Sequence, residues 1–509
     1  MTHDTSTHRL SRATVAGYAA GSVGTGGFGT LPGLVLLVYL TDALAVPAAV
    51  AGLIVTGAKV WDVVVDPFIG YGSDRDLART GSRRRFMTLG ALTLPVLFAL
   101  TFAVPAPAGP TAAAIWVLVA FLLAATAFSL FQVPYIALPA ELDPTYDGRT
   151  RLLAWRVATL AFAILLFGAG GPALRGGGDS TTGYLVMGIV SGVVIGAGML
   201  VAARVAPRGR GTPAPPADAP AAPAGAVART TAPGQGTPAP PAAAPAAPAG
   251  AVAGTTAPSS AARAWTLAVR EAVDALRRSR PFRTLLAAFV LQAVATGLML
   301  AGAAYVARYV LRDEAAVSYL FAALVAPALL CMPLWTRLAR RDGKERGFVV
   351  ATVLFAVAAL GMVPLVWAPG AWVYLPTALA GVAYAGMQAL PLAMLPDAIA
   401  HDARTHGEGR GGAFSGVWTA GETTGMALGA AVLSLVLGVT GYVSTRAGET
   451  VGQPAAAVDG IALSFSVVPA ALVLLSLVPL VRYGLRRGDI DDTAPELPRD
   501  HSPTDRARD

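Results

Sequence analysis

The sequence contains little cysteine and few charged residues. It carries one cysteine in 509 residues, Cys331, so neither a disulfide framework nor a thiolate metal site can form within the chain. Only 13% of its residues are charged, about half the fraction usual for a soluble domain, while 55% are hydrophobic. A chain of this composition cannot cover itself with polar surface, so we expect its solvent to be a lipid bilayer.

The sequence also lacks a phosphate-binding loop. The glycine-rich candidate, GSVGTGG at 21–27, lies inside an apolar block and follows no strand pattern. ATP-driven transport is therefore disfavoured, and we expect neither an enzyme nor a bound cofactor. The polar stretch Met1 to Arg12 leads into an apolar block far longer than the core of a signal peptide, which predicts that no leader is cleaved.

Long apolar blocks are what the sequence has instead. Each approaches or exceeds about 20 residues, the length that a helix needs to cross roughly 30 Å of hydrocarbon. They predict twelve membrane spans, at 14–40, 47–71, 86–104, 111–139, 152–173, 182–204, 284–308, 315–336, 347–367, 371–399, 412–440 and 459–483.

Basic residues gather in short loops on one side of these spans. They recur after the second and the eighth span, as Arg75, Arg79, Arg83, Arg84, Arg85, Arg337, Arg340, Arg341, Lys344 and Arg346. Because basic loops favour the cytoplasm, the pattern predicts a multi-pass protein of the plasma (inner) membrane with both termini cytoplasmic. It also accounts for the net charge of +8 without a nucleic-acid partner.

A segment without large apolar residues separates the sixth and seventh spans. Residues 207–262 are mainly Pro, Ala, Gly and Thr, which predicts a disordered cytoplasmic linker. Within it, Gly211 to Pro233 is repeated at Gly236 to Pro258 with two differences. The predicted domains are a first bundle at 1–206, the linker at 207–262, an amphipathic helix (263–280) plus second bundle at 263–490, and a disordered cytoplasmic tail at 491–509.

The order of these parts narrows the fold. Six spans, a linker and six more spans, with basic loops in corresponding places, predict an all-α membrane protein of two pseudo-symmetric six-helix bundles. This is the plan of the major facilitator fold.

The segment KVWDVVVDP, Lys59 to Pro67, places three charges on one face of the second span. Lys59, Asp62 and Asp66 stand at i, i+3 and i+7. An ionised residue at the centre of a membrane helix costs about 2.5 to 3.5 kcal/mol, so a functional role is expected. Two carboxylates one turn apart can coordinate Na⁺ or share a proton. We interpret Asp62 and Asp66 as the coupling-cation site; the alternative is a structural cluster in which Lys59 neutralises Asp62.

Polar residues of the fourth and fifth spans could complete this site. Ser129 could offer its hydroxyl to the carboxylates if spans two and four touch, and Gln132 lies one turn further on. Either could instead bond its own helix or a neighbour. Arg156, about a turn inside the fifth span, could present a cation to an anionic substrate group or reach back to the inner surface.

Glu422 lies near the middle of the eleventh span, too deep to reach water easily. We expect it to be functional, either paired with a basic residue such as Lys59 or Arg156 or able to take a proton.

Charged residues at the inner end of the tenth span and in the loop after it suggest a gate. We assign a cytoplasmic salt-bridge network that closes the gate to Asp397, Asp402, Glu408 and Arg410. Arg308, near the outer end of the seventh span, is expected at the membrane interface.

Six segments carry a family resemblance. They are GYAAG near the start of the first span, YLTD at Tyr39 to Asp42, KVWDVVVDPFIGYGSDR at 59–75, VPYIALPAEL...DGRTRLLAWR at 133–156, SRPFRTLL at 279–286 and LPDAIAHD...GEGRGGAFSGVW at 395–418. Together they resemble the glycoside-pentoside-hexuronide:cation symporters, a branch of the major facilitator superfamily. The resemblance covers most of the chain outside the linker and the tails.

The resemblance implies roles for individual residues. Asp62 and Asp66 match the carboxylates that bind the coupling cation, and Ser129 falls where the family can add a hydroxyl. Arg156 matches a basic residue of the sugar site. With it, we assign the substrate site to Lys59, Gln132, Arg156, Trp418 and Glu422.

Three departures from the family concern the sugar half of the site. Gly26 stands where the sugar-binding carboxylate of the first helix should be. Gln132 replaces the second sugar-contacting carboxylate, and Glu422 falls where the family usually has a lysine. The resemblance therefore implies a retained cation site and a substrate other than a melibiose-like sugar.

The sequence thus predicts a secondary active transporter, a monomer that carries a small organic solute with Na⁺ or H⁺, Na⁺ being favoured, by alternating access. A rival within transport is a proton-driven exporter of a lipophilic metabolite, suggested by the missing sugar carboxylates. A rival of another class is an uncoupled membrane protein such as a lipid scramblase or a sensor. Asp62 and Asp66 argue against the last, since neither role needs paired buried carboxylates.

Overall fold

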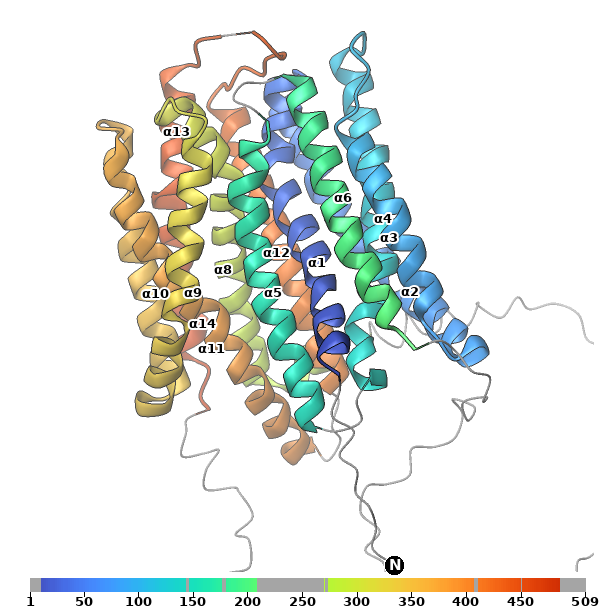
Figure 1. Cartoon of the computed structure of the whole chain (residues 1–509). Helices are drawn as coiled ribbons and strands as arrows, with labels where there is room; N and C mark the ends of the chain where they lie inside the picture. The colour runs from blue at the N-terminus through green and yellow to red at the C-terminus, as the bar shows by residue number, and fades with distance from the viewer. Residues whose placement is uncertain are drawn as a thin grey trace, which may run out of the picture.

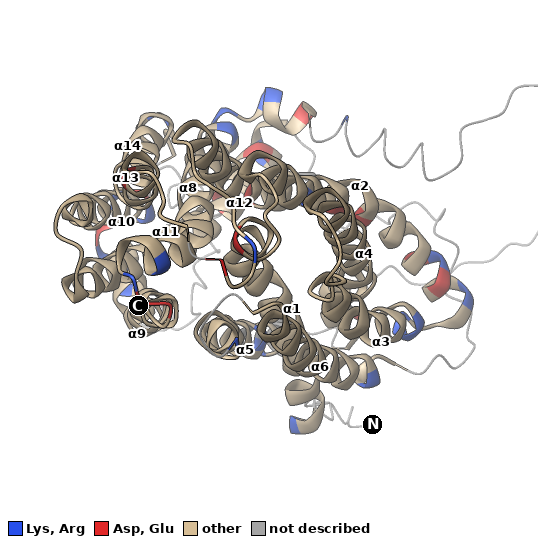
Figure 2. Ribbon diagram, turned by 90° about the horizontal axis from the view of Figure 1, so that it is seen from above, with Lys and Arg blue, Asp and Glu red and all other residues tan. Residues whose placement is uncertain are grey.

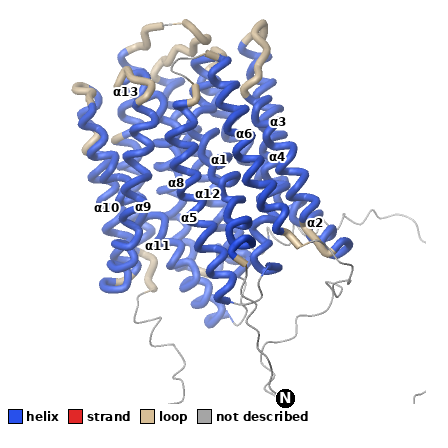
Figure 3. The backbone as a smooth tube through the Cα atoms, viewed as in Figure 1, coloured by secondary structure: helices blue, strands red, loops and turns tan. Residues whose placement is uncertain are grey.

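A computed structural model describes residues 11–142, 146–175, 180–207, 270, 273–406, 411–449 and 451–485. The predicted linker beyond Pro207, most of the predicted amphipathic helix and the predicted tail lie outside the described residues. In the part of the chain that is described, almost every residue is helical and strands are absent (Figure 3).

The N-terminal half consists of α1 (Arg12–Val38), the π-helical turn η1 (Tyr39–Ala43), α2 (Ala48–Thr80), α3 (Arg84–Thr101), α4 (Pro110–Leu142), α5 (Tyr146–Ala173) and α6 (Thr181–Val205). The C-terminal half consists of α8 (Arg280–Tyr305), the π-helical turn η2 (Val306–Val310), α9 (Ala316–Asp342), α10 (Lys344–Leu360), the short turns η3 (Val363–Val366) and η4 (Ala371–Val373), α11 (Tyr374–His406), α12 (Gly411–Val439), α13 (Ala455–Phe465) and α14 (Val467–Val481).

Every predicted span corresponds to a helix, and the fold class is confirmed. Eleven candidate spans in the described residues are long and apolar enough to cross a membrane, α13 and α14 counting together as one. The predicted third span, α3, is not among them. It has 18 residues and begins with Arg84 and Arg85, so its apolar part is shorter than about 20 residues.

The two halves repeat one packing scheme. In the N-terminal half α1 packs on α5 and α6, α3 on α4 and α6, and α2 on α4. In the C-terminal half α8 packs on α12 and α14, α10 on α11 and α14, and α9 on α11. Each contact has its counterpart six spans later, which is what two pseudo-symmetric bundles require. Seen along the helix axes, the two halves stand side by side (Figure 2).

Contacts between the halves obey the same symmetry. α2 packs on α12, its symmetry-equivalent pair α9 and α5 pack together, and α1 meets its counterpart α8. We call the end of the bundle with the α2–α3 and α9–α10 turns the basic end, and the end with η1, η2 and the segment 440–454 the far end. The basic end is at the bottom of Figure 1.

Local sequence sets several helix ends at the basic end. The Ser11 hydroxyl accepts from the Thr14 N–H at 3.0 Å and caps α1, while the Ser279 hydroxyl accepts from the Phe282 N–H at 3.4 Å and caps α8. α2 ends at Gly81, whose φ of 69° lies in the left-handed region that suits glycine.

Candidate functional site

The three charges of α2 lie on one face, as the spacing predicts. Lys59 Nζ is 3.4 Å from Asp62 Oδ2, longer than the roughly 2.7–2.9 Å of a strong charge-assisted hydrogen bond. Asp62 Oδ1 and Asp66 Oδ1 are both buried and have no hydrogen-bond partner. Lys59 therefore leaves most of the acceptor capacity of this pair unused.

α4 adds a hydroxyl to the carboxylates. α2 and α4 pack together, and the Trp61 indole N–H donates to Thr126 Oγ1 at 2.9 Å, which fixes their register. Ser129, one turn further along α4, is buried and lies close to the Asp66 carboxylate. Ser129 could reach the carboxylates only if spans two and four touch, and α2 and α4 do touch.

The donor set suits a small hard cation. Asp62, Asp66 and Ser129 supply oxygens only, the ligands that such ions prefer. No group of three His, Cys, Asp or Glu side chains that could hold a transition metal occurs in the residues that the structure covers.

A cluster of aromatic and polar groups surrounds the predicted substrate residues of the N-terminal half. The Arg156 guanidinium on α5 lies over the Tyr135 ring, 5.4 Å from its centroid, and the Tyr135 ring stacks on Tyr18 of α1 at 4.8 Å. Arg156 Nε and Gln132 Oε1 are buried without a hydrogen-bond partner. The buried Tyr18 hydroxyl also lacks a partner, so these helices leave three polar atoms for a ligand.

The C-terminal half contributes Trp418 and Glu422 from α12. The Trp418 ring stacks on Phe289 of α8 with centroids 4.2 Å apart, and its buried indole N–H has no acceptor. Glu422 is partly buried and lies within electrostatic range of Tyr384 on α11, whose hydroxyl accepts from Gln388 at 2.9 Å. The ion pairs described for the chain do not join Glu422 to Lys59 or Arg156, so the predicted pairing is not present in this conformation.

Gly26 shows why the sugar carboxylate of the first helix is missing. A Cβ at this position would lie 2.8 Å from Ala163 Cβ and 3.2 Å from the Leu160 carbonyl oxygen, both on α5. The backbones of α1 and α5 meet where the family places an acidic side chain. Gly29, almost one turn further along α1, is exposed and would meet nothing within 4 Å.

The contacts between the halves lie on the far-end side of these residues. Thr56 Oγ1 on α2 donates to the Ala427 carbonyl on α12 at 3.3 Å. With a rise of about 1.5 Å per residue, Asp62 lies about 9 Å below Thr56 toward the basic end, and Glu422 lies about 8 Å below Ala427. Further toward the far end, the Ser434 hydroxyl donates to the Ala48 carbonyl. The site therefore lies directly beneath the closed contact.

The ion pairs described at the basic end each stay within one half. Arg83 pairs with Asp74 and Glu141 at 2.5 Å in the N-terminal half. Burial lowers the pKa of the Arg83 guanidinium, but these two carboxylates more than offset it and raise the pKa above its ordinary value.

Two of the predicted gate residues pair within the C-terminal half. Lys344 Nζ is 2.6 Å from Asp397, and Arg278 is 2.5 Å from Asp402. Glu408 and Arg410 lie outside the described residues. Closure of the basic end by these groups stays a prediction, because the observed pairs do not bridge the halves.

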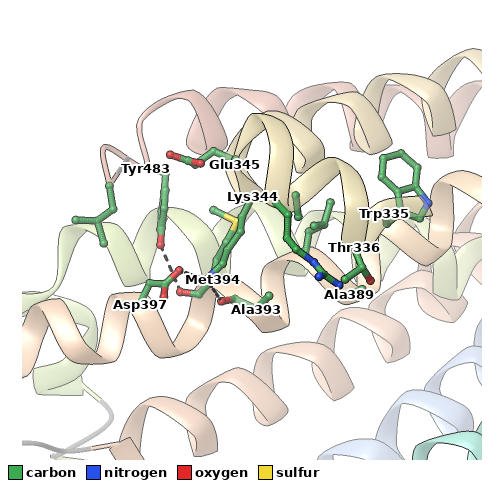
Figure 4. Close-up of a pocket in the computed structure, with 14 residues that line it drawn as sticks. Trp335, Thr336, Lys344, Glu345, Ala389, Ala393, Met394, Asp397 and Tyr483 are labelled. Atoms are coloured by element: carbon green, nitrogen blue, oxygen red, sulfur yellow. Dashed lines mark hydrogen bonds and ion pairs between the residues drawn. The ribbon is translucent and has the colours of Figure 1, made fainter. Parts of the chain in front are cut away.

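A cavity of about 500 Å³ lies beside the Lys344–Asp397 pair (Figure 4). Trp335, Leu390 and Met394 line it, and Lys344 also donates to the Ala393 carbonyl at 3.0 Å. Since all of these residues belong to the C-terminal half, the cavity is separate from the substrate residues of α4 and α5.

Sequence reasoning missed two groups of residues. Tyr18 and Tyr135 carried no signal, because an aromatic residue in a membrane helix is ordinarily packing. The expectation that Arg308 lies at the membrane interface did not foresee its partner: its Nη1 is 3.1 Å from Oδ2 of Asp42, a fully buried carboxylate. The signal that could have found this pair is Asp42 itself, an acidic residue that ends an apolar span.

Comparison with known proteins places the chain in context. It matches the family described as MFS/sugar transport protein over residues 17–228 and 251–487. It is 24% identical to the glucuronide carrier protein homolog of Escherichia coli K12 over 491 residues, 94% of this chain and 93% of the relative.

The putative glycoside/cation symporter YagG of Escherichia coli K12 is 28% identical over 186 residues, 35% of this chain. The matched region spans 30 to 40% of the length of YagG and two other curated relatives. A solved structure of a proton-dependent oligopeptide transporter superposes with a TM-score of 0.60 at 13% identity, covering 92% of this chain and 98% of that one. At that identity the likeness shows the fold alone.

Proposed function

The chain belongs to the MFS/sugar transport protein family, and from that premise we propose that it is a secondary active transporter that moves a small organic solute together with a cation. The resemblance to the glycoside-pentoside-hexuronide:cation symporters is confirmed by the family match and by relatives named as a symporter and a carrier.

The observation that carries the proposal is the pair of unsatisfied oxygens on α2. Leaving a buried polar atom without a partner costs about 1–3 kcal/mol, and more for a charged group. Asp62 Oδ1 and Asp66 Oδ1 both bear that cost on one helix face, beside the Ser129 hydroxyl. A bound Na⁺ would supply the missing partner to both carboxylates, which is why we favour Na⁺ over H⁺ as the coupling ion.

The substrate would bind between the halves, next to the cation. Gln132 Oε1 and Arg156 Nε from the N-terminal half, and Trp418 Nε1 from the C-terminal half, are free for hydrogen bonds to it. Closure around the solute brings groups of α4, α5 and α12 together, and the cation lowers the electrostatic cost of burying Asp62 and Asp66 during that movement.

The remaining assignments follow from this reading. The protein is a multi-pass membrane protein, which we place in the plasma membrane as a monomer with the basic end and both termini toward the cytoplasm. In the opposite conformation, Asp397 and Asp402 would help to close the basic end.

The cation site can be tested without knowing the solute. Na⁺ that binds only the folded protein raises its stability by RT ln(1 + [Na⁺]/Kd), about 2.7 kcal/mol at 100 times Kd. Purified protein in detergent should therefore melt at a higher temperature in NaCl than in choline chloride of equal ionic strength. The Asp62→Asn/Asp66→Asn variant should fold, because it loses a desolvation cost, but should lose this Na⁺-specific shift.

Asp459→Asn on α13 is the matched control, since it neutralises a carboxylate in a membrane helix away from α2 and α4. It should keep the Na⁺-specific shift. If the double Asn variant keeps the Na⁺-specific shift, Asp62 and Asp66 do not form the cation site. If lowered pH stabilises the parent protein and Na⁺ does not, the coupling ion is H⁺ rather than Na⁺.

A further inference from the structure

The YLTD segment, which the proposed transport site does not use, ends at a buried carboxylate. Asp42 lies in the π-helical turn η1 at the far end of α1 and is 0% exposed. Within its own half, the Thr41 hydroxyl donates to Asp42 Oδ1 at 2.6 Å. A carboxylate in this position needs further donors.

Those donors come from the other half of the molecule. The Tyr309 hydroxyl donates to Asp42 Oδ2 at 2.8 Å, and Arg308 Nη1 lies 3.1 Å from the same oxygen. The Tyr442 hydroxyl donates to Asp42 Oδ1. Burial and the nearby Asp42 carboxylate raise the pKa of Tyr442, so its hydroxyl keeps the proton that it donates. One carboxylate of the N-terminal half thus organises three side chains of the C-terminal half.

Backbone pairing reinforces this junction. Thr445 N–H donates to the Thr41 carbonyl at 2.8 Å, Ala45 N–H to the Thr445 carbonyl at 2.7 Å, and Ala447 N–H to the Ala43 carbonyl at 3.1 Å. The segment after η1 and the segment after α12 therefore form a short antiparallel contact, with a bridge between Leu44 and Arg446.

The closed junction also holds backbone strain. Ala45, two residues after η1, has a φ of 54°, and Arg312, two residues after η2, has a φ of 56°. Both lie in the left-handed region that residues with a Cβ rarely adopt. They follow the two π-helical turns at equivalent places in the two halves, so a hinge at each would relax when the halves separate.

We propose that Asp42 is the central residue of a gate at the far end, and that its contacts with Arg308, Tyr309 and Tyr442 break in every transport cycle. We call these four residues the far-end gate. The inference rests on the proposed function, because a gate has meaning only in alternating access. Beyond that function, the inference identifies Asp42 as the residue that sets how often the far end opens.

The physical reason is a balance between two hydration states. In the closed state the Asp42 and Arg308 charges are desolvated and offset one another, whereas in the open state water hydrates both. Removing the carboxylate leaves Arg308 without this offset in the closed state only. Asp42→Asn should therefore shift the population toward the open state rather than unfold the protein.

The test measures opening directly. In a Cys331→Ser background, which removes the single native cysteine, the Ser434→Cys variant places a thiol at the closed α2–α12 contact, where Ser434 is 3% exposed. In lipid nanodiscs a membrane-impermeant maleimide should label it only when the far end opens. Adding Asp42→Asn should raise the labelling rate at least about tenfold, given what a buried ion pair loses with one partner.

Three further variants make the result specific. Asp313→Asn neutralises an exposed carboxylate at the same end, where Asp313 Oδ1 accepts from the Ala315 N–H, and should change the rate less than about twofold. Tyr442→Phe removes one donor and should raise the rate several-fold. Asp42→Asn combined with Arg308→Gln should raise it by less than the product of the two single effects.

The outcomes separate this inference from the proposed function. Labelling needs no solute and no ion gradient, so it reports on the gate whatever binds to Asp62 and Asp66. If folded Asp42→Asn and Tyr442→Phe label at the rate of the parent, the proposed gate is wrong. Should Asp42→Asn fail to fold, Tyr442→Phe and Tyr309→Phe decide, because they remove only hydroxyl groups: raised rates support the gate and unchanged rates overturn it.

Discussion

At the scale of single residues, buried polar atoms without partners support the proposed site where several of them lie on adjacent helices. Single examples are uninformative: Ser191 Oγ and Ser464 Oγ also lack partners, and both lie in helix packing. The informative set combines donors and acceptors on adjacent helices, at Asp62 Oδ1, Asp66 Oδ1, Gln132 Oε1, Arg156 Nε and Trp418 Nε1. Sequence reasoning selected these same five residues from charge, depth and motif.

Glu422 permits a prediction at this scale. In this conformation it lies near Tyr384, and the ion pairs described do not include it. We expect Glu422→Gln to weaken solute binding by about tenfold, since a hydrogen bond to a charged group contributes roughly 1.5–3 kcal/mol, and to leave the Na⁺-specific thermal shift unchanged. Solutes that stabilise the parent in a thermal screen with NaCl would be titrated against both proteins.

The control for this substitution is Glu449→Gln. Glu449 is exposed at the far end and accepts from the Arg446 N–H at 3.0 Å, so its neutralisation should leave solute affinity unchanged. If Glu422→Gln binds solute normally but loses pH-driven flux in vesicles, the residue carries a proton. Unaltered binding and flux would mean that Glu422 has a structural partner.

At the scale of one element, the glycines of α1 differ in their surroundings: some pack against other helices, and one has open space opposite it. Several of its glycines face α5 or α6: a Cβ at Gly24 would lie 2.3 Å from Met199 Cγ, and one at Gly27 would lie 2.7 Å from Phe167 Cε2. Small residues let membrane helices approach closely, and this approach places α1 at the centre of its half. Gly29 breaks the pattern, because nothing stands opposite it.

Two alanine substitutions in α1 should therefore change the stability of the protein in opposite directions. Gly26→Ala forces its Cβ to 2.8 Å from Ala163 Cβ and should destabilise the protein by about 1–3 kcal/mol. Gly29→Ala meets no atom and removes a glycine from a helix interior, which should stabilise by about 0.5–1 kcal/mol. Thermal unfolding in detergent compares the two. Equal melting temperatures would show that α1 and α5 do not meet at Gly26.

At the scale of the whole molecule, the described hydrogen bonds between the halves lie toward the far end, while the described ion pairs of the basic end each stay within one half. The observed contacts between α2 and α12, α5 and α9, and α1 and α8 are symmetric in the two halves. A rocking movement about this junction would close the basic end and open the far end while each bundle keeps its internal packing.

A cross-link at the far end tests this movement. Directly opposed residues of an antiparallel pair have Cβ atoms about 4.5–5.5 Å apart, close to disulfide range. Leu44→Cys with Arg446→Cys, in the Cys331→Ser background, should stop solute counterflow in vesicles when oxidised and restore it on reduction. Either single cysteine should leave counterflow unaffected by oxidant. Full activity in the oxidised pair would show that the far end need not open.

The duplicated segment between the halves predicts tolerance to shortening. Because Gly236 to Pro258 nearly repeats Gly211 to Pro233, removing one copy keeps the composition of the connection. We expect the transport rate of the deletion variant to stay within about twofold of the parent at equal expression, since loop length has a weak effect on closure entropy. A larger fall in rate would reveal a function in the repeat.

The sequence by itself determined the helices, their order and the shared face of Lys59, Asp62 and Asp66. In a bilayer each backbone polar group must be satisfied within its own helix, so apolar length alone locates a span. The positions of Lys59, Asp62 and Asp66 on one face follow from helical periodicity, which is equally local. α3 shows the limit of this reasoning, because two arginines at its start shorten its apolar part.

Only the tertiary structure decided which distant side chains meet. Asp42 and Tyr309 are 267 residues apart, and no periodicity links the end of one span to the end of another six spans later. The same holds for Arg156 over Tyr135 and for Glu422 near Tyr384. The state of the proposed far-end gate would depend on how the two bundles tilt against each other. That balance comes from contacts and hydration summed over both halves, which no local pattern records.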